Sequence, residues 1–225
     1  MDVLSILIDW SPYIVAGIAA TLGLVLIALG IGILLGLPMA LGQVYGSRPV
    51  RWVIGVYVWF FRGLPILVLL FLFWFGIFPG IGLGDLPAFV VGAVVLGLRG
   101  AAYQSQIFRG AIQSISDGQM IAARSLGMSR FIAIYSVILP QAMRIALPGW
   151  SNEYPNMLTD SAVCYAIGVA ELLTVTSRIV SQTYLTMPIF LASAGIFILL
   201  NYGGIKVLHG VERRIAIPGF GSGAV

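Results

Sequence analysis

Long apolar segments constrain this sequence more than any other feature. Five of them cover about residues 12–38, 52–78, 86–108, 145–173 and 185–208. Each is long enough for a bilayer core, which takes roughly 20 residues of helix. Charged residues make up only 9% of the chain, whereas a soluble domain carries roughly a quarter. The sequence therefore predicts a single all-α integral membrane domain, residues 1–225, with five transmembrane helices.

The second apolar segment contains a proline that interrupts it. Pro65 follows Arg62, Gly63 and Leu64, and a proline inside a helix removes one backbone hydrogen bond and clashes with the preceding turn. We expect a kink or a break there, with Arg62 in a structural role that holds it.

The distribution of basic residues predicts the orientation in the membrane. Cytoplasmic loops carry an excess of lysine and arginine. The segments expected on one side of the membrane hold most of the lysine and arginine, whereas those on the other side have chiefly Arg178. The cytoplasmic set lies in the first connection, the central stretch 109–144 and the C-terminal region: Arg48, Arg51, Arg109, Arg124, Arg130, Arg144, Lys206, Arg213 and Arg214. We therefore expect the N-terminus outside and the C-terminus in the cytoplasm. The positive charge is explained by this placement, and no nucleic-acid partner is expected.

The central stretch, residues 109–144, reads as two short helices between the apolar halves. Ser116 or Asp117 is a suitable N-cap for a helix over 118–126, and Gly127 suits its left-handed end. Ser129 caps a second helix that we expect to end before Pro140. Such a loop fits the groove of a partner protein. A helical hairpin that only covers its own bundle is an equally supported alternative.

Several short motifs in order along the chain resemble one transporter family. The run Gly118 to Ala123, then Leu126-Gly127 and Ile138 to Ala142, is similar to the EAA loop of ABC importer membrane subunits. Further matching pieces are Gly17 with Thr21-Leu22, Arg62 to Pro65, Ala101 to Tyr103, Arg109-Gly110, Leu147-Pro148 with Asn152, and Ile167 to Val169 with Glu171-Leu172. Together they resemble the polar amino acid branch, the histidine and glutamine permease type. Three departures are Ile121 for the loop's glutamate, Gln106 for another glutamate, and Thr159 to Ala162 for a Lys-Asp-Thr-Ser run.

The resemblance implies a type I importer fold in a prokaryotic plasma (inner) membrane, with a cytoplasmic coupling loop between helices 3 and 4. It implies two ABC ATPase subunits, a second permease copy or a paralogue, an extracytoplasmic binding protein and an amino acid substrate. It assigns ATPase coupling to the first loop helix and its stop: Asp117, Gly118, Gln119, Ala122, Ala123, Arg124, Leu126 and Gly127. The chain's sole lysine, Lys206, is followed by Val207 and forms no P-loop. ATP and magnesium are therefore expected in the separate ATPase, and no cofactor in this chain.

Ionisable residues at membrane depth are candidates for the substrate pathway. We hypothesise that Arg99, Asn152, Asp160 and Ser161 line a cavity near the middle of the membrane, where the arginine could hold a carboxylate. The alternative for Arg99 is an internal ion pair with Asp160 or Glu171.

Other functional classes find less support in the sequence. No hydrolase motif is present, and neither the single cysteine, Cys164, nor the single histidine, His209, suggests a catalytic or metal site. We expect Cys164 to be a small buried residue. A secondary carrier or channel subunit for a small polar solute is the main alternative to an importer subunit. A membrane scaffold is another, and it should not alter the ATPase rate of a co-purified subunit.

Overall fold

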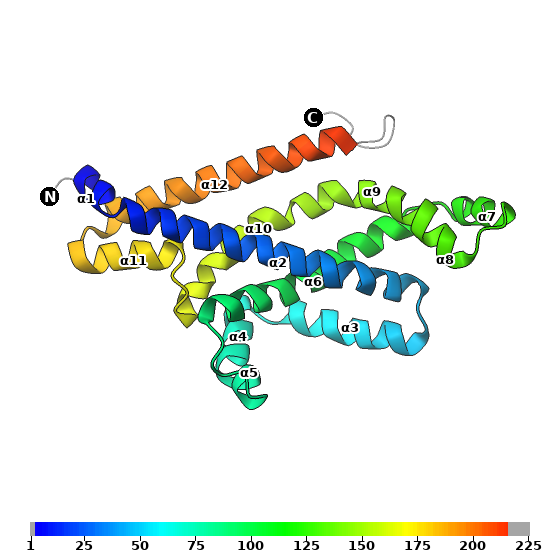
Figure 1. Ribbon diagram of the computed structural model, residues 1–225, viewed down its shortest axis with the longest axis horizontal. Coiled ribbons are helices and arrows are strands. Elements are labelled where there is room, and N and C mark those ends of the chain that lie inside the picture. Colours follow the sequence, from blue (N-terminus) through cyan, green and yellow to red (C-terminus); the bar gives the residue numbers. More distant parts are fainter. Residues whose placement is uncertain (1–2, 216–225) are drawn as a thin grey trace.

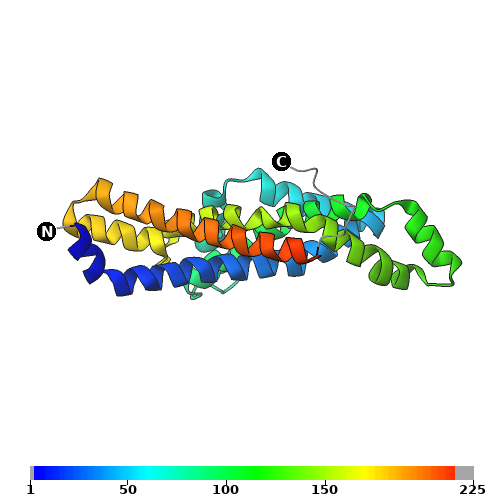
Figure 2. The same ribbon diagram turned by 90° about the horizontal axis from the view of Figure 1, so that it is seen from above.

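The computed structural model describes residues 3–215, and that part of the chain is helical with no strand (Figures 1 and 2). Its elements in chain order are α1 (Val3–Asp9), α2 (Ser11–Tyr45), α3 (Arg48–Gly63), α4 (Ile66–Phe71), the π-helix η1 (Leu72–Ile77), α5 (Phe78–Gly80), α6 (Ala88–Gln113), α7 (Asp117–Ser125), α8 (Arg130–Ala133), the π-helix η2 (Ile134–Ile138), α9 (Leu139–Ser151), α10 (Glu153–Ser161), the 3₁₀ helix η3 (Ala162–Ile167), α11 (Leu172–Thr183) and α12 (Thr186–Ile215).

Four helical stretches are long and apolar enough to cross a membrane: Ser11–Tyr45, Ala88–Gln113, Arg130–Ser151 and Thr186–Arg214. Two bent pairs pass the same test, Arg48–Gly63 with Ile66–Gly80 and Glu153–Ile167 with Leu172–Thr183. The described residues thus hold four to six candidate spans. The predicted class, an all-α membrane domain, is confirmed.

The predicted break at Pro65 is confirmed. Helix α3 ends at Gly63, Leu64 and Pro65 have extended backbone, and the chain turns by 108° before α4 continues. Proline lacks the amide hydrogen that a continuous helix would use at this position. The expected span 52–78 is therefore two helical pieces that run in different directions.

Pro140 does not end a helix, contrary to our expectation. Helical structure continues from Arg130 through η2 and α9 to Ser151. The π-helix η2 lies directly before Pro140, just as η1 lies before Pro79. Wider π turns rearrange the carbonyl groups with which a proline ring would otherwise clash. Consequently residues 145–173, which we expected as one span, are divided among α9, α10, η3, the turn that follows and the first two residues of α11.

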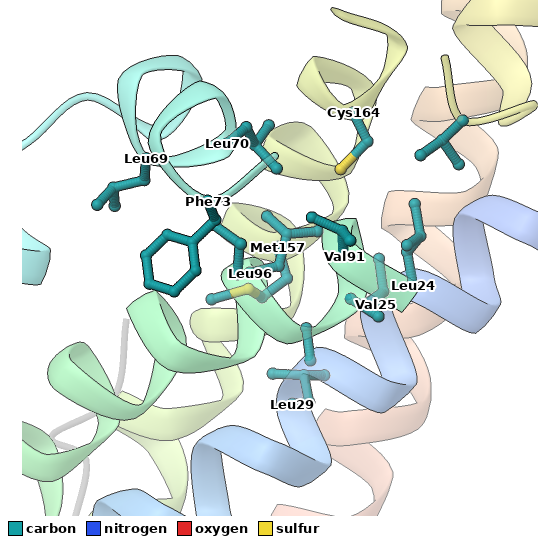
Figure 3. Packing of buried hydrophobic residues seen from close by; sticks show 14 of the residues in the cluster. Leu24, Val25, Leu29, Leu69, Leu70, Phe73, Val91, Leu96, Met157 and Cys164 are labelled. Carbon is teal, nitrogen blue, oxygen red and sulfur yellow. The ribbon is translucent and has the colours of Figure 1, made fainter. Parts of the chain in front are cut away.

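The core lies where α2 packs along α6 and where α4 and α10 meet them (Figure 3). Small residues allow the close approach of α2 and α6, which is a common solution for helices in lipid. A Cβ atom at Gly97 of α6 would lie 2.6 Å from Cβ of Ile31 of α2. Cys164 is fully buried in this core, as expected.

The molecule is elongated, and its two ends differ in composition. Helices α7 and α8 form one end, toward which the C-terminal part of α12 also points, whereas α1 and α11 lie at the opposite end (Figures 1 and 2). The connection from α2 to α3, with Arg48 and Arg51, lies toward the α7 end. Arg178 of α11 lies at the other end.

Candidate functional site

A cavity of about 300 Å³ opens between α6 and α10. Its lining is mostly polar and consists of Arg99, Tyr103, Glu153, Asn156, Met157, Thr159 and Asp160. The spacing of these residues follows the helical repeat. Positions 99 and 103 share one face of α6, and positions 153, 156, 157 and 160 share one face of α10. Two amphipathic faces in otherwise apolar surroundings therefore create a polar cavity.

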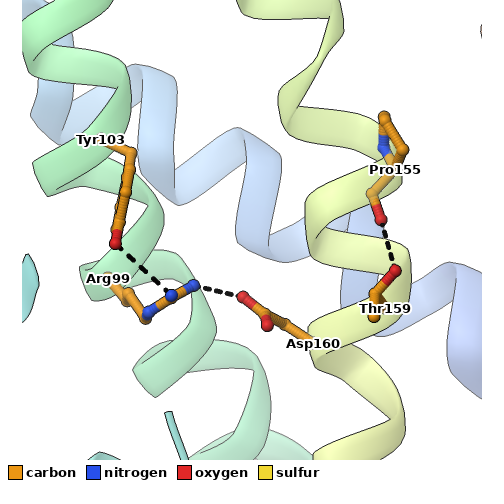
Figure 4. Close-up of polar contacts among 5 residues, drawn as sticks. All are labelled: Arg99, Tyr103, Pro155, Thr159 and Asp160. Atoms are coloured by element: carbon orange, nitrogen blue, oxygen red, sulfur yellow. Dashed lines mark hydrogen bonds and ion pairs between the residues drawn. The ribbon is translucent and has the colours of Figure 1, made fainter. Parts of the chain in front are cut away.

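An ion pair crosses this cavity (Figure 4). The Nη1 atom of Arg99 donates to the carboxylate of Asp160, and the pair is partly buried, with side chains 18% and 19% exposed. The guanidinium also lies 4.8 Å from the centre of the Tyr103 ring, and its Nη2 is 3.5 Å from the hydroxyl of Tyr103. This is the internal pair that the sequence left open for Arg99, and its partner is Asp160.

Glu153 adds a second carboxylate to the cavity. It is the first residue of α10 and only 5% exposed. It lines the cavity together with Arg99 and Asp160. Since Asp160 already pairs with Arg99, the lining holds one more acidic group than basic groups. A buried excess of negative charge favours a cation in the cavity.

Two of the four residues hypothesised to line the cavity lie outside its lining. Asn152 is exposed, and its amide donates to the carbonyl of Pro148 at 3.3 Å. Ser161 is fully buried, and its hydroxyl donates to the carbonyl of Leu158 at 2.7 Å. Both side chains satisfy backbone groups of their own helices. Our sequence reasoning missed Glu153 and Asn156, although their spacing of seven and four residues from Asp160 was a usable signal.

Glu171 lies outside the cavity lining and has a structural role at the start of α11 (Leu172–Thr183). The chain turns at Gly168, with φ of 85°, and Glu171 then caps α11. Its carboxylate accepts from the amides of Leu173 and Thr174, both at 2.7 Å. The amide of Leu172 donates to the hydroxyl of Thr21 on α2 at 3.2 Å. Glu171 is thus a buried N-cap that fixes the second bend of the chain.

The predicted caps of the loop helix are confirmed. The hydroxyl of Ser116 accepts from the amide of Gly118 at 3.3 Å, and that of Ser129 from the amide of Ile132 at 3.3 Å. At the other end of α7, Gly127 has φ of 82°. Its amide donates to the carbonyl of Arg124, and the amide of Met128 donates to that of Ala123. This pair of bonds is the Schellman arrangement that ends a helix.

The residues at a spacing of three along α7 are not all packed against the chain. Ala123 is buried and Met120 packs against the cluster formed by α2, α6 and α9, but Leu126 is 80% exposed. As the last residue before the left-handed turn, Leu126 has left the helical repeat. Ile121 is 65% exposed. The other candidate coupling residues, Asp117, Gly118, Gln119, Ala122 and Arg124, are exposed as well.

Helix α7 is fastened to the rest of the chain. The Gln119 side chain accepts from Nε2 of Gln141 on α9 at 3.3 Å, and the guanidinium of Arg130 lies 5.5 Å from the ring centre of Tyr45 on α2. Helix α7 is therefore linked to α9 through Gln119, and the neighbouring helix α8 is linked to α2 through Arg130. Among residues 3–215 no group of histidine, cysteine or acidic side chains could hold a metal ion.

Residues 32–217 match the family of binding-protein-dependent transport system inner membrane components. This chain belongs to that family. A relative is the histidine/lysine/arginine/ornithine transport system permease protein HisM of Salmonella typhimurium, 35% identical over 210 residues that cover 90% of this chain and 89% of that protein. Another is the nopaline transport system permease protein NocM of Agrobacterium fabrum, 32% identical and covering 90% and 87%.

Solved structures agree with this family. An amino acid ABC transporter crystallised with histidines has a chain 36% identical to this one, with a TM-score of 0.84, covering 95% of this chain and 99% of that one. A chain of the inward-facing MetNI methionine ABC transporter has a TM-score of 0.80 at 18% identity and shares the fold.

Membership defines the class of this protein. Members are multi-pass inner-membrane subunits of ABC importers, and they are transport components rather than enzymes. The family context implies a separate ATPase and a substrate-binding protein as partners. The importer interpretation of the sequence is confirmed, and a secondary carrier or channel is set aside.

Proposed function

We propose that this chain is the permease subunit of an importer for amino acids with a cationic side chain. The observation that carries the proposal is the charge of the side chains that line the cavity, two carboxylates to one guanidinium; the exposed guanidinium of Arg62 lies outside this lining. Because Asp160 pairs with Arg99, Glu153 is the group left to hold a cation from the substrate. The histidine, lysine, arginine and ornithine named for HisM are consistent with this charge.

The proposed pathway contains Arg99 and Asp160, joined by Glu153 and Asn156. Arg99 keeps the charge of Asp160 compensated, since an unpaired carboxylate at this depth would be costly. Glu153 and Asn156 then face the substrate with an ionic and a neutral acceptor. Asn152 and Ser161, which we first placed in the pathway, take a supporting role within α9 and α10 through the backbone bonds described above.

The complete transporter that we propose has two permease subunits, two ATPases and an extracytoplasmic binding protein. The second permease is a copy of this chain or a paralogue, and ATP with magnesium binds in the ATPases. Exposed apolar side chains on α2 and α12, such as Leu34 and Leu199 at 71% and 70%, suit contact with lipid or with the second permease.

The orientation we propose places α7 in the cytoplasm and α1 outside. Most basic residues of the described chain lie toward the α7 end, which the positive-inside rule favours. Five crossings are then formed by α2, by α3 with its bent continuation to α5, by α6, by the path from α8 to α11, and by α12. This assignment modifies our expected limits mainly at the second and fourth crossings.

Helix α7 is the proposed coupling element. Its exposed apolar residues Ile121 and Leu126 are available to a groove of the ATPase, while Met120 and Ala123 hold the helix to this chain. A helix that is bound on both sides can transmit closure of the ATPases to the membrane helices.

ATP hydrolysis and uptake in proteoliposomes test the proposed substrate class. The complex is co-purified with its ATPase and assayed with the binding protein loaded with each of a panel of amino acids. We expect arginine, lysine or histidine to stimulate both activities. Stimulation by glutamate or aspartate alone would overturn the proposal.

A matched pair of variants tests whether Glu153 is the group that binds the cationic substrate. Glu153→Gln removes the proposed cation-binding charge with almost no change of shape, and we expect at least a tenfold loss of apparent affinity for the cationic substrate. Asp85→Asn removes an exposed carboxylate in the connection before α6 and should leave the affinity unchanged.

A further inference from the structure

The Tyr103 ring contacts two guanidinium groups. Arg99 of α6 lies 4.8 Å from its centre and Arg62 of α3 lies 4.9 Å from it. Arg62 belongs to the last turn of α3, directly before the break at Leu64 and Pro65. Three elements therefore meet at this ring, which itself lines the cavity.

The two arginines differ in how they are held. Arg99 is partly buried and paired with Asp160. Arg62 is exposed, and within residues 3–215 its guanidinium has no ion pair or hydrogen bond; it lies against the Tyr103 ring. A cation–π contact at an exposed site is weaker than a hydrogen bond between charged groups. A carboxylate can therefore recruit Arg62 from Tyr103, but it can recruit Arg99 only by separating a formed ion pair.

We infer that Arg62 binds the α-carboxylate of the transported amino acid, while Glu153 holds the cationic end. This assignment rests on the proposed function of the cavity and adds the second half of substrate recognition to it. Tyr103 lines the cavity together with Glu153, and the guanidinium of Arg62 lies 4.9 Å from the centre of its ring, so groups of opposite charge are available to the two ends of one bound molecule. A planar guanidinium offers two parallel donors that match the two oxygens of a carboxylate.

The position of Arg62 at a backbone break gives the inference a structural reason. Leu64 and Pro65 have extended backbone between α3 and α4, and Pro65 has no amide hydrogen to donate, so the end of α3 can adjust without unwinding a helix. Tyr103 keeps the guanidinium near the cavity when it is empty. The ring thus pre-positions a charge that the substrate then uses, which lowers the entropic cost of binding.

The test compares binding of L-arginine with binding of agmatine, which is arginine without its carboxyl group. Binding is measured directly on the complex purified with its ATPase, with the binding protein omitted so that only the permease discriminates. We expect the original complex to prefer L-arginine roughly ten- to one-hundredfold. We expect Arg62→Gln to lose that preference by weakening L-arginine binding while agmatine binding stays the same.

Two further variants separate recognition from general damage. Arg51→Gln removes an exposed arginine of the same helix far from the cavity, and it should keep the full preference. Arg62→Lys should keep part of it, because an ammonium group still attracts a carboxylate but cannot donate in parallel.

The outcomes distinguish the two proposals. If the original complex prefers L-arginine and Arg62→Gln retains the same preference, the assignment of Arg62 is overturned and the cavity proposal stands. If the original complex binds both compounds equally, the assignment is overturned as well. If it binds neither compound, the proposed function of the cavity fails and the role of Arg62 fails with it.

Discussion

The cavity between α6 and α10 and the proposed coupling helix α7 are opposite in the kind of side chain that they bury and expose. The cavity keeps charged side chains inside an apolar molecule, where Arg99 and Asp160 pair across two neighbouring helices. Helix α7 and its C-terminal end keep apolar side chains outside, with Leu126 80% exposed. The ion pair of the cavity forms within this chain, whereas the apolar surface of α7 is covered only when another protein binds there. A variant in the cavity should therefore affect the isolated permease, and a variant in α7 should affect the assembled transporter.

Loss of Arg99 should give the largest effect and should appear in the isolated permease. Arg99→Ala leaves two acidic residues, Asp160 and Glu153, without their nearby cation. Removing one member of a fully buried pair costs about 3–5 kcal/mol, and the cost for this partly buried pair should lie at or below the lower end of that range. We expect a lower thermal midpoint of the detergent-solubilised subunit and almost no transport.

The double variant Arg99→Ala with Asp160→Ala is the control for that prediction. It removes both charges, so it should be less destabilised than Arg99→Ala alone. Equal midpoints for the two variants would mean that the pair is not what stabilises this region. Transport at unchanged apparent affinity by Arg99→Ala would remove Arg99 from the pathway altogether.

A side chain added at position 127 should disturb the proposed coupling helix α7 and leave the isolated permease folded. The φ of 82° at Gly127 is a left-handed conformation, which costs other residues about 1–2 kcal/mol. Gly127→Leu should displace the end of α7, so that ATP hydrolysis continues with several-fold less transport per ATP. The ratio of uptake to hydrolysis in proteoliposomes measures this coupling.

Gly110→Ala provides the matched control for Gly127→Leu. Gly110 has helical backbone in α6 and no atom within 4 Å of an added Cβ, so coupling should be unchanged. Normal coupling in Gly127→Leu would contradict our assignment of the coupling element.

Truncation of Leu126 tests whether the exposed surface of α7 contacts the ATPase. Leu126→Ala should weaken binding of the ATPase by about 1 kcal/mol, roughly fivefold, because less apolar area is covered in the complex. The thermal midpoint of the permease alone should not change. Leu199→Ala truncates a similarly exposed leucine on α12, and equal loss of the ATPase in both variants would argue against a specific contact at α7.

Local signals in the sequence predicted the caps of α7 and the break at Pro65, because each depends on one residue and its immediate neighbours. Gly127 needed only its backbone preference, and Ser116 only its hydroxyl. The path through Pro140 could not be predicted in this way, since the π turns of η2 accommodate the proline ring and no single residue signals a π turn.

The charges of the cavity were only partly predictable for a similar reason. Hydropathy identified Arg99 and Asp160 as unusual at that depth, but it could not tell whether they meet, nor whether Glu171 competes with Asp160. That depended on Gly168, which turns the chain so that Glu171 caps α11 instead. The choice between Asn152 and Asn156 depended on which face of α10 meets α6, and only the packing of the two helices decides that.

The smallest effect we expect concerns Asn152 and Asn156. The two residues are one helical turn apart, and only the second lines the cavity. Asn156 lines the cavity, so Asn156→Ala should remove one neutral hydrogen bond to the substrate, worth about 0.5–1 kcal/mol. The apparent affinity for the transported amino acid should fall roughly two- to fivefold. Asn152→Ala removes the same group one turn earlier, where the amide donates to the carbonyl of Pro148, and uptake should be unaffected. If Asn152→Ala weakens uptake and Asn156→Ala does not, the substrate follows the face of the helix that the sequence first suggested, and the cavity described here is not its path.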